Sequence, residues 1–124
     1  MITYNNISQL PIRERSFKFA IEIIKFCTLL KEERQYEIAK QLIRSGTSIG
    51  ANIRESNNGF TKKDFIFKVN IAQKEADETI YWLEIIKEVS DLKEETNHLL
   101  YEAMQLLKII RTISINAKNK QQPI

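Results

Sequence analysis

The scarcity of helix-breaking residues constrains the fold of this chain more than any other feature. Its two prolines, Pro11 and Pro123, lie near the ends of the sequence, and its three glycines are Gly46, Gly50 and Gly59. Proline removes a backbone hydrogen bond from a helix and glycine lowers helix stability, so long segments without them favour helices. The sequence therefore predicts an all-α fold. A length of 124 residues suits one domain around a single core.

Apolar residues recur at helical spacing in four segments, at about residues 12–31, 35–57, 62–89 and 93–117. The Asn-Asn-Gly sequence at residues 57–59 tolerates the left-handed conformation that ends many helices. Thr61 and Asp64 match a capping box at the start of the third segment. We expect one antiparallel, up-down-up-down four-helix bundle over residues 1–124, with partly disordered termini.

Most of these segments carry more apolar surface than one bundle core needs. The first segment has two apolar stripes, one formed by Phe17, Ala20, Ile24 and Cys27 and the other by Phe19, Ile23, Phe26 and Leu30. The last segment keeps strict four-three spacing at Leu99, Ala103, Leu106, Ile110, Ile113 and Ala117, with further apolar residues beside that stripe. This surplus predicts that the bundle packs against copies of itself in a homo-oligomeric ring.

The stretch of residues 41–86 resembles a helical hairpin with small residues in its first arm. Glycine in a helix interior costs about 1 kcal/mol relative to alanine, so Gly46 and Gly50 predict the close approach of a neighbouring backbone. Antiparallel pairing about the turn places Arg44 beside Glu75, Gln41 beside Glu78, and Ser48 beside Asn70 or Ile71. We interpret ten residues as structural contacts of the hairpin rather than a ligand site: Gln41, Arg44, Gly46, Ser48, Gly50, Asn52, Glu55, Asn70, Glu75 and Glu78.

The net charge of +3 is distributed unevenly along the chain. Basic residues outnumber acidic ones in the first segment, and no acidic residue follows residue 107. The first and last helices are neighbours in a closed four-helix bundle, so their positive charges would adjoin. The candidate contacts to nucleic-acid phosphates are Arg13, Arg15, Lys18, Lys25, Lys108, Arg111, Lys118 and Lys120. A solvated charged face without a ligand is the alternative interpretation.

Signals for catalysis or metal binding are almost absent from the sequence. His98 is the only histidine, which argues against a His-rich metal site, and the only cysteine, Cys27, is expected to be a buried, inert thiol. Glu95 and His98 form one E-x-x-H pattern, whereas a di-iron bundle needs two such patterns and two further glutamates. We therefore expect no enzyme, no cofactor and no metal.

The sequence also lacks the features of a membrane or secreted protein. No apolar run approaches the roughly 18 residues that a membrane span needs. The first residues do not follow the basic-then-apolar order of a secretory signal. We expect a cytoplasmic protein that makes no contact with a membrane.

Two motifs carry a resemblance to a known family: RSGTSIGANIRES at residues 44–56 and ADETIYWLEII at residues 76–86. They resemble the hallmark of the bacterial four helix bundle proteins that are encoded by intervening sequences of large-subunit ribosomal RNA genes. Relatives include the accessory variability protein of diversity-generating retroelements, a pentameric barrel with a basic surface that binds nucleic acid and associates with reverse transcriptase. The resemblance implies a homo-oligomer, in particular a pentamer, and a nucleic-acid or nucleoprotein partner.

We therefore hypothesise a non-enzymatic oligomeric scaffold that binds RNA or DNA through backbone phosphates. The basic candidates would act as point charges or forks rather than as readers of bases. The competing hypothesis is a self-associating structural or protein-interaction module without a nucleic-acid role. Clustering of the basic candidates on one exposed face would favour the first hypothesis, and scattering among acids the second. A cleft that joins Glu95 and His98 to further carboxylates would favour an enzyme.

Overall fold

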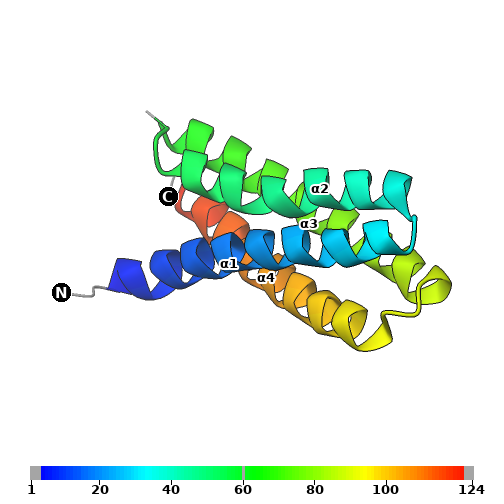
Figure 1. Cartoon of the computed structure of the whole chain (residues 1–124). Coiled ribbons are helices and arrows are strands. Elements are labelled where there is room, and N and C mark those ends of the chain that lie inside the picture. The colour runs from blue at the N-terminus through cyan, green and yellow to red at the C-terminus, as the bar shows by residue number, and fades with distance from the viewer. Residues whose placement is uncertain (1–3, 60, 122–124) are drawn as a thin grey trace.

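The computed structural model describes the backbone of residues 4–59 and 61–121 and the side chains of residues 12–59 and 61–119. Its helices are α1 (Tyr4–Glu32), α2 (Tyr36–Ser56), α3 (Lys62–Val89) and α4 (Lys93–Gln121). They run up, down, up and down, so the start of α1, the end of α4 and the α2–α3 turn lie together, opposite the other two turns (Figure 1). The predicted all-α four-helix architecture is confirmed, and α1 and α4 extend beyond the expected limits at residues 12 and 117.

A capping box fixes the start of α3. The side chain of Thr61 accepts a hydrogen bond from the backbone N–H of Asp64 at 3.1 Å, and the Asp64 carboxylate accepts one from the backbone N–H of Thr61 at 3.3 Å. These two bonds satisfy donors that have no partner within a helix. The predicted capping box is therefore present, although aspartate replaces the more common glutamate.

The left-handed residue lies in a different turn from the one expected. Asn57, after α2, is right-handed with φ −78°, and no described glycine has a positive φ. Arg34, in the α1–α2 turn, has φ 63° instead. There the N–H of Gln35 donates to the carbonyl of Leu30 at 2.9 Å, as in a Schellman motif. The expectation of a left-handed stop at residues 57–59 is thus wrong.

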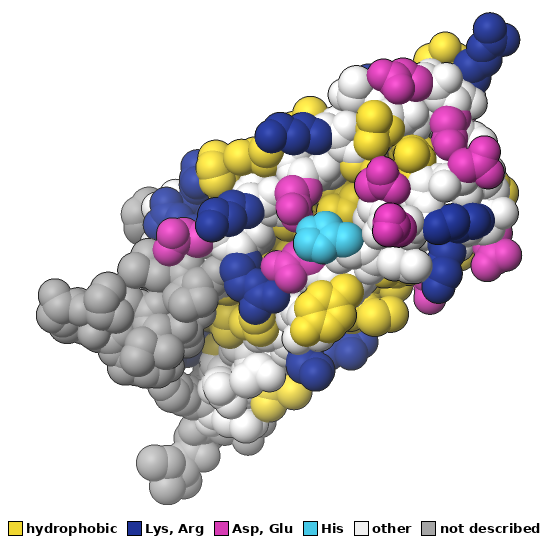
Figure 2. Space-filling model, turned by 60° about the horizontal axis from the view of Figure 1, so that its bottom comes forward, with side chains coloured by type: hydrophobic (Ala, Val, Ile, Leu, Met, Phe, Trp, Pro, Cys, Tyr) yellow, Lys and Arg dark blue, Asp and Glu magenta, His cyan; other side chains and the backbone are white. Residues whose placement is uncertain are grey.

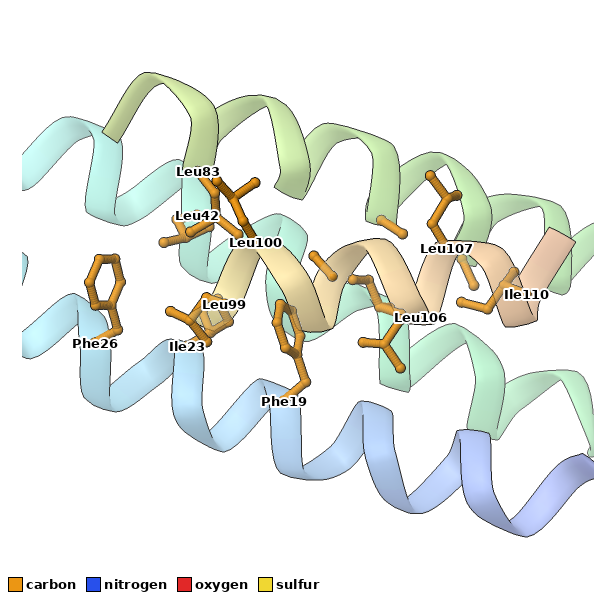
Figure 3. Packing of buried hydrophobic residues seen from close by; sticks show 14 of the residues in the cluster. Phe19, Ile23, Phe26, Leu42, Leu83, Leu99, Leu100, Leu106, Leu107 and Ile110 are labelled. Carbon is orange, nitrogen blue, oxygen red and sulfur yellow. The ribbon is translucent and has the colours of Figure 1, made fainter. Parts of the chain in front are cut away.

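One of the two apolar stripes of α1, Phe19, Ile23, Phe26 and Leu30, is wholly buried in the core, whereas only Cys27 of the other stripe is buried. Phe19, Ile23 and Phe26 point between the other three helices and are at most 4% exposed (Figure 3). Phe17 and Ile24, from the other stripe, are 52% and 49% exposed. Burial of such a side chain stabilises the fold by about 1.5–3 kcal/mol. The stripe that contains Phe19 and Ile23 therefore accounts for most of the packing energy of α1.

All four helices contribute large, fully buried side chains to a single core: Ile12, Phe19, Ile23, Leu30, Leu42, Ile49, Leu83, Ile86, Leu106 and Ile110. These residues alternate with charged and polar ones along each helix. Consequently none of the described helices has an apolar stretch long enough to cross a membrane.

Cys27 lies in this core with no exposed surface. Its thiol is 3.5 Å from the carbonyl oxygen of Ala39 on α2, to which it donates. Burial raises the pKa of Cys27 to about 11, although the charge of Lys31 acts in the opposite direction. The thiol is therefore protonated at neutral pH, and the expectation of a buried thiol is confirmed.

The seams between neighbouring helices differ in extent. Helix α2 packs closely against both α1 and α3, and α3 packs closely against α4. Helix α4 crosses α1 obliquely, and this pair makes the least contact of the four neighbouring pairs (Figure 1). The expected adjacency of the first and last helices is therefore present but limited.

Candidate nucleic-acid interface

Ion pairs join the two arms of the α2–α3 hairpin. One guanidinium nitrogen of Arg44 lies 3.4 Å from Glu75, and another donates to Glu78. The indole N–H of Trp82 donates to the same Glu78 carboxylate at 3.2 Å. The expected Arg44–Glu75 contact is therefore present, and Arg44 also pairs with Glu78, which was expected beside Gln41.

These contacts shift the pKa of Glu78. Its partial burial acts to raise the pKa, but the hydrogen bonds from Arg44 and Trp82 and the charges of Arg44 and Lys74 outweigh that effect. The pKa of Glu78 therefore lies below its usual value, because these partners favour the charged carboxylate. The hydrogen bond to Glu78 likewise raises the pKa of Arg44.

Two polar residues of α2 bond to their own helix rather than to α3. The hydroxyl of Ser48 donates to the carbonyl oxygen of Arg44 at 2.6 Å. The side-chain amide of Asn52 donates to the carbonyl oxygen of Ser48 at 2.8 Å. Short polar side chains reach the backbone one turn earlier in this way. Ser48 and Asn52 thus form no described hydrogen bond to α3.

The other two polar residues expected in the hairpin, Glu55 and Asn70, have partners on different helices. Glu55 accepts a hydrogen bond from the ammonium group of Lys68 on α3 at 2.8 Å, which agrees with a hairpin contact. Asn70 or Ile71 was expected beside Ser48 of α2, and the side-chain oxygen of Asn70 accepts a hydrogen bond from Ser114 of α4 at 2.8 Å. Asn70 therefore marks the register of α3 against α4.

The glycines of α2 permit close contact with α1. A Cβ added at Gly46 would lie 3.0 Å from side-chain carbons of Ile23, and one added at Gly50 would lie 3.1 Å from the carbonyl oxygen of Ser16. The predicted close approach of a neighbouring backbone is present at Gly50. The neighbour is α1, however, and not the hairpin partner α3.

A buried pair of hydroxyls, which the sequence analysis missed, joins α2 to α3. The hydroxyl of Thr79 lies 3.0 Å from that of Ser45, and neither residue has exposed surface. The spacing offered a signal, because Thr79 lies three residues after Ala76 and four before Leu83 on the apolar stripe of α3. A polar residue at such a position needs a buried partner.

The adjoining surfaces of α1 and α4 carry charges of both signs. Figure 2 shows Lys and Arg side chains interspersed with Asp and Glu around the single histidine. Arg15 forms a two-bond ion pair with Glu102, at 2.9 and 3.0 Å. The positive charges that were expected to adjoin on the first and last helices are therefore mixed with acidic side chains on this face.

Positive charge gathers instead at one end of the bundle, where α1 begins, α4 ends and the α2–α3 turn lies. We divide each helix near its middle, after residues 18, 46, 75 and 107. The first halves of α1 and α3, the second halves of α2 and α4, and the α2–α3 turn together form the half of the bundle that we name the basic end. It contains eleven described Lys and Arg side chains against four acidic ones. The eleven are Arg13, Arg15, Lys18, Arg54, Lys62, Lys63, Lys68, Lys74, Lys108, Arg111 and Lys118.

The opposite half, which we name the acidic end, has twelve Asp and Glu residues against seven Lys and Arg residues. Lys25 lies in this half, although it was grouped with the basic candidates. The side chain of Lys120 lies outside the described residues. The candidates were grouped by helix, but the ratio of basic to acidic side chains differs between the two halves of the bundle more than between helices. Antiparallel packing then brings the basic halves together.

A groove of about 360 Å³ between α1 and α4 lies at the acidic end. Its floor includes Phe26, and its rim carries Glu22, Glu94, Glu95 and His98. The His98 ring lies 3.3 Å from the Glu22 carboxylate. Glu95 and His98 thus do share a groove with further carboxylates, the arrangement that would favour an enzyme. The side chains of His98 and Glu22 are 63% and 46% exposed, however, whereas catalytic groups usually lie where water is excluded. Among the described side chains, no three His, Cys, Asp or Glu residues are placed to hold a metal ion.

A second groove, of about 310 Å³, lies between α1 and α2. Phe17, Thr47 and Ala51 contribute to its lining, and the guanidinium of Arg54 lies 5.5 Å from the centre of the Phe17 ring. Phe17 also begins an exposed apolar stripe of α1, which consists of Phe17, Ile21 and Ile24. Apolar surface therefore adjoins the groove.

A third groove, of about 400 Å³, runs between α3 and α4 and reaches into the basic end. Its lining is mostly polar and includes three cationic side chains: the residues are Asn70, Gln73, Lys74, Asp77, Leu107, Arg111 and Lys118. Two of the predicted phosphate contacts, Arg111 and Lys118, thus meet Lys74 of α3 in one groove. Lys74 is not among the phosphate contacts that the sequence predicted.

Comparisons with known proteins agree with this architecture. Residues 8–112 match the model of the 23S rRNA-intervening sequence protein family. A similar solved structure is a protein of unknown function from the S23 ribosomal protein family of Bacteroides thetaiotaomicron, with 37% identity and a TM-score of 0.79 over 83% of this chain and 97% of that chain. Comparison with curated proteins gives no match. The chain belongs to the 23S rRNA-intervening sequence protein family, as the resemblance of its hairpin motifs predicted.

Proposed function

We propose that this protein binds RNA or DNA through backbone phosphates, without a catalytic step, and that the basic end is the binding surface. The observation that supports the proposal is the separation of charge along the bundle, eleven basic against four acidic side chains at one end. Such a concentration of positive charge attracts a polyanion even though the whole chain has a net charge of only +3.

The chemistry of the basic end suits phosphates better than base edges. Its cations come from all four helices, and Lys18, Lys108 and Arg111 are among those with no described carboxylate partner. Phosphate contacts of this kind release condensed counterions and carry no sequence information. Binding should therefore be strongly dependent on salt and nearly independent of sequence.

We also propose that copies of the chain associate through the exposed apolar stripe of α1 and the adjoining α1–α2 groove. Phe17, Ile21 and Ile24 are 52%, 38% and 49% exposed and share one face of the helix. Burial of that face would stabilise a homo-oligomer, for which the family resemblance suggests a pentameric ring. An oligomer repeats the basic end and multiplies its attraction for phosphates.

A charge-reversal experiment tests the binding surface. Fluorescence anisotropy would follow the binding of labelled RNA and DNA between about 50 and 200 mM salt. The double variant Lys108→Glu with Arg111→Glu should weaken binding to all sequences and lower the slope of log affinity against log salt by about 2. The control, Lys25→Glu with Lys40→Glu, makes the same charge change at the acidic end and should leave that slope unchanged.

The second candidate function is a self-associating or protein-interaction module without a nucleic-acid role, which the exposed apolar stripe favours. The absence of nucleic-acid binding by wild-type protein at low salt would support it and contradict the first proposal. Light scattering tests self-association separately. A particle of 14.6 kDa, the mass of one chain, would contradict the oligomer, and Ile24→Asp should dissociate an oligomer that uses the α1 stripe.

A further inference from the structure

We propose that the α3–α4 groove holds one unpaired nucleotide of a single-stranded nucleic acid, with its phosphate among Lys74, Arg111 and Lys118 and its base over Leu107. The inference rests on the proposed binding of nucleic acid and assigns it a strand type and a preference among bases. Three observations carry it: the volume of the groove, the order of charges along it, and the polar side chains beside its apolar floor.

The order of the lining residues follows from the register of the two helices. The hydrogen bond from Ser114 to Asn70 sets these residues at the same height. Because α3 and α4 are antiparallel, Lys118 lies one turn farther toward the basic end. Lys74 and Arg111 lie about one turn in the other direction, toward the middle of the bundle. The cations therefore follow the groove inward from the basic end.

The outer part of the groove is suited to a phosphate group. Lys74, Arg111 and Lys118 are exposed, and none forms an ion pair with a described carboxylate. Two ammonium groups and a guanidinium fork can donate to several oxygens of one phosphate. Asp77, the only acidic residue of the lining, lies beyond them toward the middle of the bundle and would repel a phosphate placed there.

The inner part of the groove is suited to a base. Leu107, the one apolar residue of the lining, is 7% exposed, so it would contact only an edge of the base while the polar side chains beside it hold the rest. The Asp77 carboxylate can accept from an exocyclic amino group, which adenine, cytosine and guanine have and uracil lacks. Gln73 adds an amide that can donate and accept. The groove should therefore favour adenine and cytosine over uracil.

The groove excludes a base pair. Its volume of about 400 Å³ lies within the range of small-ligand sites and suits one nucleotide unit. Bases of a duplex are paired and stacked inside the helix, so only an unpaired base can lie over Leu107. A duplex would reach the cations of the basic end but not the inner part of the groove.

The test compares short labelled oligo(A), oligo(C) and oligo(U) with an RNA duplex of equal length by fluorescence anisotropy. Wild-type protein should bind oligo(A) and oligo(C) about fivefold more tightly than oligo(U). Asp77→Asn should reduce this preference to near one while strengthening overall binding, because it removes a negative charge. Glu14→Gln, which makes the same charge change at the basic end outside the groove, should strengthen binding without changing the preference.

The outcomes separate this inference from the proposed function. Equal binding of all the probes, weakened by Lys108→Glu with Arg111→Glu, would overturn the groove assignment and leave phosphate binding in place. Absence of binding to every probe would overturn both. Free AMP should compete much more weakly than unlabelled oligo(A). If AMP displaces the labelled probe at the same concentration as oligo(A), the ligand is a free nucleotide and not a strand, and the proposal is overturned.

Discussion

Helix α2 packs against its two neighbours by opposite means. Toward α1 it presents Gly46 and Gly50, whose missing side chains let the two helices approach closely. Toward α3 it presents Arg44 and Ser45, whose side chains reach carboxylates and a hydroxyl across the seam. The α1–α2 seam therefore depends on the absence of side chains at two glycines, whereas the α2–α3 seam depends on bonds between side chains.

The difference decides how each seam responds to change. An atom added at Gly50 meets the α1 backbone, which can move only with the whole helix. Truncation of the Arg44 side chain removes its ion pairs with Glu75 and Glu78. The side chain is 50% exposed, so water and salt already weaken these pairs and their loss should change stability little. The α1–α2 seam should thus be more sensitive to mutation, although the α2–α3 seam has more side-chain bonds.

The largest expected effect follows from filling the glycine seam. Gly50→Leu should lower the free energy of unfolding by about 1–3 kcal/mol, because the new side chain forces α1 away from α2. Urea denaturation followed by circular dichroism would measure it. The matched control, Lys40→Leu, adds the same side chain at an exposed position of α2 and should change stability little. An unchanged unfolding midpoint for Gly50→Leu would show that the seam is not tightly packed.

Alanine at the two glycines separates backbone contact from side-chain contact. Alanine favours a helix over glycine by about 1 kcal/mol, which offsets part of any crowding. A Cβ at position 46 meets two γ carbons of Ile23 at 3.0 Å, and this buried, β-branched side chain can shift only slightly. A Cβ at position 50 meets the carbonyl oxygen of Ser16 at 3.1 Å, and this atom can shift only with the backbone of α1. Gly46→Ala should therefore be more stable than Gly50→Ala by about 1 kcal/mol in the same urea titration. The reverse order would contradict the comparison.

The sequence was sufficient to predict the four helices, their order and the capping box, because those depend on local periodicity and on residues near one another. It did not predict which neighbour the glycines face. Helical spacing shows that Gly46 and Gly50 share a face, but only packing determines which helix covers that face. In the same way, the sequence of α1 contains two apolar stripes, and only packing decides that the stripe of Ile23 is wholly buried while the other is buried at Cys27 alone.

The candidate binding surface was less predictable for a topological reason. Arg111 and Lys118 were recognised as basic residues of the last helix, but their neighbour Lys74 belongs to α3, whose whole-helix charge gave no signal. Lys25 was grouped with them because it lies on α1, although it is placed at the other end of the bundle. Grouping charges by half-helix after predicting the up-down order would have separated them.

The buried hydroxyls of the α2–α3 seam should have a smaller effect. Thr79→Val replaces a hydroxyl with a methyl group of similar size, and Ser45 can still donate to the carbonyl of Leu42 at 3.5 Å. We expect a loss of about 1 kcal/mol, typical of one hydrogen bond. A double-mutant cycle with Ser45→Ala should give a coupling energy of about 0.5 kcal/mol or more. Simple additivity of the two variants would show that the hydroxyls do not interact.

The smallest effect is expected at the ion pairs of Arg44, where the sign of the pH dependence is informative. Arg44→Ala should cost less than about 1 kcal/mol at neutral pH, since the side chain is half exposed. The pKa of Glu78 is lowered from its usual value of 4.5 in the folded protein, so its contribution is present above pH 4.5 and is lost as the pH falls through the folded pKa.

The difference in stability between wild type and Arg44→Ala should therefore shrink as the pH is lowered from 7 to 3, and it should also shrink at high salt. Urea titrations of both proteins at each pH would measure it. Glu55→Gln provides a control, because the Glu55–Lys68 pair lies elsewhere on the same seam and leaves the Arg44 contacts intact. A difference that stays constant between pH 7 and 3 would mean that Arg44 contributes through packing of its aliphatic part rather than through the charge of Glu78.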